Sequence, residues 1–355
     1  MGSAHAHAGG GAGDGVARGV VGAWSYCGAS PPDQACHAEV AIIDFAHKHE
    51  PRIPVHDGVD IDGFLADFFE PEQPILFKQI ARTESSAEAL CRRLNARIAA
   101  DEARVSLQTL CWDVSPSVIE AICPIPRVVA SALDPERVFV RERHVRLWFN
   151  REGHRTLWHY DGHSMHVFNL QLKGRKRWRI VAPETPLLCA PLTSFCMFDD
   201  YALERRRSYE FETHEGDMVF IPRHWYHSVD SIDELNININ WVMTPRRATP
   251  SNPTARREAE LTWLKSRTRW AWPRSVRDYN DAYGGVGRPA IDLLTQTVSP
   301  WAGAKRAGIE ALKLPLALAG YWSLRPNLQA ANRSNRVLRE LVLRERVPSP
   351  SRLTR

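Results

Sequence analysis

Apolar residues in the first part of the chain recur with the spacing of amphipathic helices. In residues 60–70 the large apolar side chains fall at i, i+3, i+4, i+7 and i+8, so they share one helical face. They are Ile61, Phe64, Leu65, Phe68 and Phe69. Residues 85–100 open with Ser85 and Glu88, which have the spacing of a capping box, and continue with leucines on one face. The pattern predicts two helices, with a short strand-like run at residues 73–79 between them.

From residue 144 the apolar period shortens to two, which is the period of a half-buried strand. In the sequence HVRLWFN, Val145, Leu147 and Phe149 share one face. Further strand-like runs lie in residues 166–183, 216–222 and 234–245. Several short strands separated by turns predict a sandwich or barrel. After about residue 250 the spacing is helical again.

These changes divide the chain into four segments. Residues 1–50 are rich in Gly and Ala, lack the pattern of a signal peptide, and are expected to be a flexible N-terminal segment. Residues 51–140 are expected to be a helical part packing on the core. Residues 141–245 form the predicted β core, and residues 246–355 a basic helical C-terminal region.

Two further features bear on location. No apolar run approaches the ~20 residues that a membrane-spanning helix needs. The seven cysteines form no CxxC pair and no zinc-site spacing, which argues against a disulfide framework and favours a reducing compartment. We therefore expect a cytoplasmic protein without a membrane span.

Charge is distributed unevenly along the chain. Residues 246–355 contain 21 basic and 8 acidic residues, a net charge of +13, whereas residues 1–245 contain 25 and 33, a net charge of −8. A basic region of this size indicates contact with something acidic, either nucleic acid, a membrane surface or the acidic remainder of the protein itself.

The sequence TLWHYDGHSMH contains the strongest candidate for a metal site. On a strand, His159 and Asp161 point to the same face because they are two residues apart. His227, at the end of the run GDMVFIPRHWYH, supplies a third ligand from another strand. Two imidazoles and a carboxylate leave open positions in an octahedral shell, which is typical of non-haem Fe(II) oxygenases.

Three other histidines are alternative ligands. We expect His163 and His166 to line the site or to pack in the core, and His224 to lie at the rim near the substrate.

Four stretches together resemble the JmjC-type, cupin-like Fe(II)/2-oxoglutarate oxygenases. They are TLWHYDG, FNLQLKGRKRWRIVAP, GDMVFIPRHWYHSV and NININW. The resemblance is specific over residues 144–245, fainter over residues 54–80, and nearest to the branch that contains factor-inhibiting HIF and bacterial cupin-like proteins. It implies a mainly β core, a double-stranded β-helix (cupin or jelly roll) with N-terminal and C-terminal helical additions.

The resemblance also implies roles for individual residues. His159, Asp161 and His227 match the iron ligands, and a further set matches contacts of the co-substrate 2-oxoglutarate. That set is Lys176, Thr156 and Asn240.

The residues themselves support these roles unequally. Lys176 shares a strand face with apolar residues, so it needs an anionic partner if it is buried. Asn240 shares a polar face with Asn236 and Asn238, which suits the lining of a binding barrel. Simple strand parity, however, places Thr156 opposite His159, so its assignment rests on the resemblance alone.

The sequence departs from the family pattern in three places. Leu157 stands where the family often has Pro, and His224 where it often has Gly. The segment after Asp161 is about two residues longer, so the family's co-substrate asparagine there has no secure counterpart. The residues nearest to that place are Met165, His166 and Val167, with Asn169 further along.

The implied reaction is hydroxylation of a C–H bond, with O2 and 2-oxoglutarate consumed and succinate and CO2 formed. The expected substrate is a protein or peptide side chain. Alternatives are the same chemistry on RNA or a small metabolite, by hydroxylation or demethylation, and a non-catalytic metal-binding cupin. The basic C-terminal region leaves nucleic acid open as a partner. By analogy with the same branch, the C-terminal helices are expected to form a homodimer interface.

Overall fold

The structure is a computed structural model that describes most of the chain between residues 53 and 319. The described residues are 53–56, 60–82, 86–100, 105–107, 111–114, 116–120, 122–140, 144–185, 187–197, 208–248, 251–271 and 288–319. The predicted flexible segment 1–50 and the end of the basic region, residues 320–355, lie outside them.

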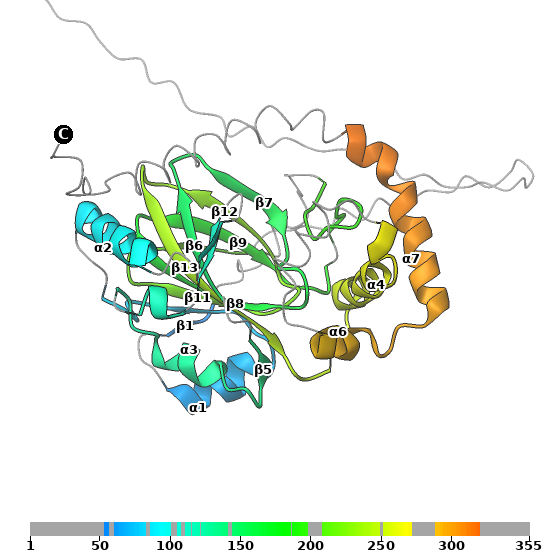
Figure 1. Cartoon of the computed structure of the whole chain (residues 1–355), viewed down its shortest axis with the longest axis horizontal. Helices are drawn as coiled ribbons and strands as arrows, with labels where there is room; N and C mark the ends of the chain where they lie inside the picture. The colour runs from blue at the N-terminus through cyan, green and yellow to red at the C-terminus, as the bar shows by residue number, and fades with distance from the viewer. Residues whose placement is uncertain are drawn as a thin grey trace, which may run out of the picture. The chain divides into compact units, whose positions relative to one another are not determined.

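Strands of the described residues form two sheets (Figure 1). The larger sheet has the order β1-β2-β11-β8-β13-β6-β4-β3, with β5 also paired to β13. Its strands are β1 (Val55–His56), β2 (Ile75–Phe77), β3 (Val105–Leu107), β4 (Cys111–Val114), β5 (Val138–Phe139), β6 (Val145–Asn150), β8 (His166–Lys173), β11 (Met218–Ile221) and β13 (Asn236–Pro245). The smaller sheet has the order β10-β9-β12-β7. Its strands are β7 (Arg155–His159), β9 (Lys176–Val181), β10 (Tyr209–Thr213) and β12 (Tyr226–Ser231).

The chain crosses repeatedly between these sheets from β6 to β13. Strands β6, β8, β11 and β13 belong to the larger sheet, and β7, β9, β10 and β12 to the smaller one. This alternation is that of a double-stranded β-helix, so the predicted jelly-roll core is confirmed. The turn between β8 and β9 is at Gly174, whose φ of +74° is readily adopted only by glycine.

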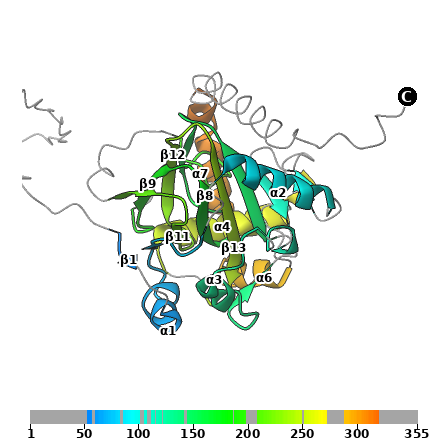
Figure 2. The same cartoon turned by 90° about the vertical axis from the view of Figure 1, so that its left-hand side faces the viewer.

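Helices from the N-terminal part cover one face of the larger sheet (Figures 1 and 2). They are α1 (Ile61–Phe64), continued by a π-helical turn over Leu65–Phe69, α2 (Ala87–Ala100) and α3 (Arg127–Ala132), with a 3-10 turn at Pro116–Val118. Phe64 and Phe69 of the predicted apolar stripe are buried against Phe168 and Phe220 of the sheet. The rest of the stripe is only partly buried against the same core.

The C-terminal region contributes three helices, of which the second and third both pack on the first, and a 3-10 turn at Arg269–Ala271 (Figure 1). They are α4 (Pro253–Arg267), α6 (Arg288–Thr295) and α7 (Pro300–Leu312). Helix α4 begins at Asn252, whose side chain accepts a hydrogen bond from the Ala255 backbone N–H at 2.7 Å. Arg257 and Glu258 in α4 are buried, so this helix is not a solvated surface element.

The helices in the described ranges are short or polar by membrane standards. None is both long enough and apolar enough to cross a bilayer.

Candidate metal centre

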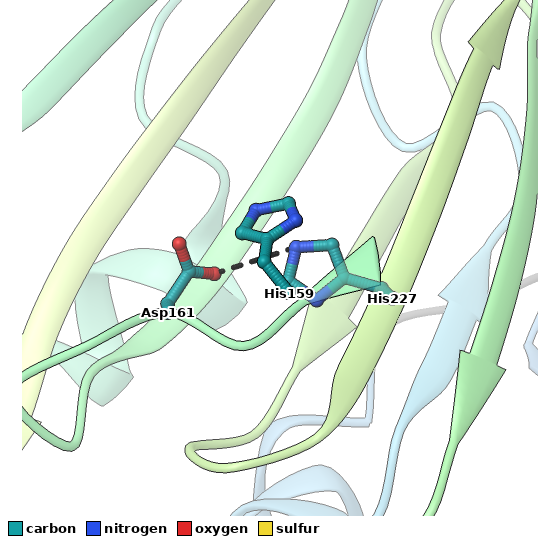
Figure 3. A group of neighbouring side chains, drawn as sticks. All are labelled: His159, Asp161 and His227. Atoms are coloured by element: carbon teal, nitrogen blue, oxygen red, sulfur yellow. Dashed lines mark ion pairs between the residues drawn. The ribbon is translucent and has the colours of Figure 1, made fainter. Parts of the chain in front are cut away.

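His159, Asp161 and His227 converge at one end of the smaller sheet (Figure 3). His159 ends β7, Asp161 follows two residues later, and His227 lies directly opposite His159 on the neighbouring strand β12. One potential ligand atom from each residue lies within 4.8 Å of the other two. The His227 Nε2 is 3.7 Å from an Asp161 carboxylate oxygen, and the two imidazole centroids are 4.2 Å apart. The three residues proposed from the sequence are therefore brought together.

Backbone carbonyls orient both imidazoles. The Nδ1 of His159 is 2.8 Å from the Leu157 carbonyl oxygen, and the Nδ1 of His227 is 3.1 Å from that of Trp225. A carbonyl oxygen only accepts, so Nδ1 donates a hydrogen bond in each ring, and Nε2 is the nitrogen available to bind a metal. Burial, followed by the neighbouring His227, lowers the pKa of His159 to about 4, which keeps this ring neutral and able to bind a metal.

A β-bulge places Thr156 in the same cavity as the triad. His159 pairs with His227, but Thr156 pairs with Val229, so three steps along β7 match two along β12. The extra residue reverses the strand parity. Thr156 and His159 consequently both line the cavity, and the parity argument against Thr156 does not apply.

Lys176 lies inside the barrel, where only 5% of its surface is exposed. Its ammonium group donates hydrogen bonds to the side-chain oxygens of Asn150, at 2.9 Å, and Asn238. Among the described residues no carboxylate forms an ion pair with it. Burial accordingly lowers the pKa of Lys176 to about 7. A buried cation with only neutral partners is a suitable site for the carboxylate of a ligand.

Asparagine side chains line the opposite wall. Asn240 on β13 pairs in register with Asn169 on β8, and their side-chain amides are 2.5 Å apart. Asn238 and Asn240 both line the cavity, in agreement with the polar face expected of this strand. Four residues are candidate counterparts of the family's co-substrate asparagine that follows Asp161. Met165, Val167 and Asn169 line the cavity, whereas His166 does not.

The alternative histidine ligands lie elsewhere. His166 packs between the rings of Phe69 and Phe220 and accepts a hydrogen bond from the Arg223 backbone N–H. His224 is fully buried, with its Nε2 2.8 Å from the Ser164 hydroxyl, so the expectation that it lies at the rim is wrong. His163 was expected either to line the site or to pack in the core, and it lines the cavity. Within the described ranges, the triad is the only group of three or more His, Cys, Asp or Glu side chains placed to hold a metal.

Two groups of cavity residues were not predicted from the sequence. Glu258 and Lys265 reach the cavity from α4, and residues 192–195 line it from a loop. In that loop, the Phe195 ring stacks on His159 with centroids 5.0 Å apart and an angle of 15°. Neither group belongs to a recognisable sequence motif. Each reaches the cavity only because distant segments of the chain pack against the β core.

The chain matches the model of a known protein family. The model of the cupin-like domain family matches residues 46–247, more than half of the chain, and includes the whole triad. The chain belongs to the cupin-like domain family. The resemblance found in the sequence is thereby confirmed, and the family match also includes the N-terminal helices that cover the larger sheet.

Similarity to individual known proteins is limited. HSPB1-associated protein 1 is 30% identical in Rattus norvegicus and 31% identical in Homo sapiens over 112 residues. These residues are 27% of this chain and 23% of each relative, so the chain spans about a quarter of their length. A solved structure of ycfD from E. coli has 14% identity and a TM-score of 0.36, covering 73% of this chain and 68% of that one.

The residues of this cupin-like site fit a metal and a dicarboxylate. Two imidazoles and one carboxylate form the donor set that binds non-haem Fe(II). In the same cavity, Lys176 and the asparagine amides offer a cation and hydrogen-bonding groups to an anionic co-substrate. The donor chemistry thus suits Fe(II) with 2-oxoglutarate.

Proposed function

We propose that this protein is an Fe(II)- and 2-oxoglutarate-dependent dioxygenase that hydroxylates a C–H bond of a protein or peptide side chain. O2 and 2-oxoglutarate would be consumed, and succinate and CO2 formed. One observation carries the proposal: the triad and the buried Lys176 line the same cavity. Membership of the cupin-like family supports an oxygenase of this general type.

Each residue has a defined part in this reaction. His159, Asp161 and His227 would hold Fe(II) on one side and leave positions for co-substrate and O2. The iron, when bound, supplies the activation of O2. Lys176 would pair with the distal carboxylate of 2-oxoglutarate and recover its full positive charge in doing so.

The remaining cavity residues would orient the co-substrate and limit access of water. Thr156 and Asn240 offer a hydroxyl and an amide to 2-oxoglutarate. Phe195 covers one face of His159, and the Trp178 ring lies 6.1 Å from that of His227. Apolar walls of this kind strengthen the ionic contact made by Lys176, because they lower the local dielectric constant.

The test is formation of succinate from 2-oxoglutarate by the iron-loaded protein in the absence of substrate. We expect slow turnover by the wild type and none by Asp161→Ala or His227→Ala. His214→Ala is the matched control, because its side chain is half exposed and lies outside the cavity. A wild-type protein that binds iron but forms no succinate would instead be a non-catalytic metal-binding cupin.

A protein substrate is favoured by the name of the relatives, which records association with the protein HSPB1. The proposal would be tested by mass spectrometry of candidate proteins for the addition of one oxygen atom. RNA and small metabolites are the alternatives. RNA as substrate would appear as binding that weakens steeply with salt and as oxidised nucleosides.

We further propose a homodimer formed through the C-terminal helices. Large apolar side chains are exposed along α7 and the residues that follow it: Trp301 is 79%, Leu312 81% and Leu316 61% exposed. A second copy of the same face would cover them. Light scattering should give a dimer mass for the wild type and a monomer mass for Leu316→Glu, with Lys305→Glu on α7 as the control.

Cytoplasmic location is also a proposal. Among the described residues, Cys123 and Cys189 are free, buried thiols. Free buried thiols are compatible with a reducing compartment.

A further inference from the structure

The carboxylate of Glu258 accepts hydrogen bonds from residues on both sides of Asp161. One of its oxygens accepts a hydrogen bond from the Tyr160 hydroxyl at 2.7 Å, and the other accepts one from the backbone N–H of His163 at 2.7 Å. Tyr160 precedes the candidate ligand and His163 follows it two residues later. Glu258 is 3% exposed and belongs to α4, outside the β core.

The segment after Asp161, to which Glu258 is hydrogen-bonded, has an unfavourable backbone conformation. His163 and Ser164 have φ values of 60° and 54°, in the left-handed region that residues other than glycine rarely adopt. Two such residues in succession turn the chain sharply from Asp161 into β8. A strained turn persists only where surrounding contacts impose it. The hydrogen bond from His163 to Glu258 is a contact of this kind.

Glu258 is held as an anion in its buried position. Burial alone would raise its pKa, but Lys265, His163 and the Tyr160 hydroxyl together lower it. The ionised form accepts two hydrogen bonds at once, and bonds to a charged acceptor are stronger than bonds between neutral groups. The contact with the Asp161 segment is therefore both charged and bidentate.

A second link joins the C-terminal helices to the other side of the site. Arg257 donates to the Tyr160 hydroxyl at 2.9 Å and pairs with Glu310 of α7 at 3.3 Å. Glu310 in turn accepts a hydrogen bond from the backbone N–H of Leu192 at 2.9 Å. Leu192 begins the loop whose Phe195 stacks on His159. Both segments that flank the metal ligands are thus fixed to the same helices.

We propose that Glu258 is a positioning residue for the metal centre: it fixes Asp161 beside the two histidines, so that the C-terminal helices are an integral part of the site. This inference rests on the proposed metal-binding function. Outer residues that orient metal ligands commonly change metal affinity by 10- to 100-fold when they are replaced.

The experiment compares Co²⁺ affinity, measured by calorimetry on folded protein, in the wild type and in three full-length variants. Glu258→Gln keeps the shape but replaces one accepting oxygen with an amide group that donates. Tyr160→Phe removes only the hydroxyl. Glu260→Gln is the matched control on the same helix, because Glu260 pairs with Arg306 at 2.7 Å and does not contact the Asp161 segment.

We expect Glu258→Gln to weaken Co²⁺ binding by at least about 10-fold and Tyr160→Phe by about 3- to 10-fold. Glu260→Gln should stay within about twofold of the wild type. The visible spectrum of bound Co²⁺, which reports its coordination, should change in Glu258→Gln and not in Glu260→Gln.

The outcomes separate this inference from the proposed function. If the wild type does not bind Co²⁺, the proposed metal-binding function is wrong. If the wild type binds it and folded Glu258→Gln binds it equally well with the same spectrum, Glu258 is only structural and the inference is overturned. Should Glu258→Gln not fold, unchanged affinity and spectrum in Tyr160→Phe overturn it.

Discussion

Replacing Lys176 with Met should stabilise the ligand-free protein near neutral pH while abolishing binding of 2-oxoglutarate. The perturbation removes a cation that is buried among neutral amides and has a pKa lowered to about 7. The ordinary value is 10.5. At about 1.4 kcal/mol per pKa unit, the charged form of Lys176 costs the ligand-free fold about 5 kcal/mol. Met removes this cost, but it leaves the oxygens of Asn150 and Asn238 without their donor, a loss of about 1–3 kcal/mol.

The balance depends on pH in a defined direction. Between pH 7 and 10.5 the unfolded wild type binds more protons at Lys176 than the folded one, so the wild-type free energy of unfolding rises with pH. Below pH 7 both states are protonated, and the destabilising contribution is constant and complete. Lys176→Met should therefore gain about 2–4 kcal/mol at pH 6, and the gain should shrink by up to about 1.4 kcal/mol per pH unit above pH 7.

The assay is urea unfolding of wild type and variant at pH 6, 7, 8 and 9, combined with calorimetry of 2-oxoglutarate binding. Lys173→Met is the control, because Lys173 pairs with Glu215 in a partly exposed position and should change stability by only about 1 kcal/mol or less. A loss of stability in Lys176→Met at pH 6, or a difference from wild type that is independent of pH, would refute the reasoning.

Two further predictions concern the scaffold that carries the site, and both are checked by urea unfolding. Gly174→Ala should lower the free energy of unfolding by at least about 2 kcal/mol, because a Cβ there would lie 2.3 Å from the Leu235 carbonyl oxygen at a φ of +74°. The control is Gly153→Ala, which has a similar φ of +73° but open space around the Cβ, and it should cost only about 1–2 kcal/mol. Equal losses would show that the clash is relieved. Asn252→Ala should cost about 1 kcal/mol through loss of the α4 cap, and Asn252→Gly only a few tenths; a loss below about 0.3 kcal/mol in Asn252→Ala would contradict this role.

The parts of this protein that follow local rules could be predicted from the sequence. Alternation over residues 144–150 predicted β6, and the apolar stripe over residues 61–69 predicted the first helix, because burial of one face fixes the period. The second half of that helix is a π-helical turn, which apolar spacing alone does not distinguish from an α-helix. The triad followed from strand geometry together with a family resemblance.

Other features depend on tertiary contacts and could not be predicted in this way. The bulge in β7 reverses the side on which Thr156 lies, yet nothing in residues 155–159 marks one residue as extra. His224 was expected at the rim, but its contact with Ser164, 60 residues earlier, draws it into the interior. Glu258 reaches Tyr160 across 98 residues of chain, a contact that only the packing of α4 on the barrel creates.

The same packing alters the interpretation of the basic C-terminal region. Several of its cations are already paired inside the molecule: Arg247 with Glu70 and Glu72, and Arg306 with Glu260. A net charge of +13 therefore overstates what this region offers to nucleic acid. Deleting the residues beyond 250 would not test RNA binding cleanly, because the deletion also removes cavity-lining side chains of α4. Charge-reversing substitutions at the exposed Arg267 and Lys305 leave those side chains in place, and only a lower salt dependence of RNA binding in these variants would indicate a nucleic-acid surface.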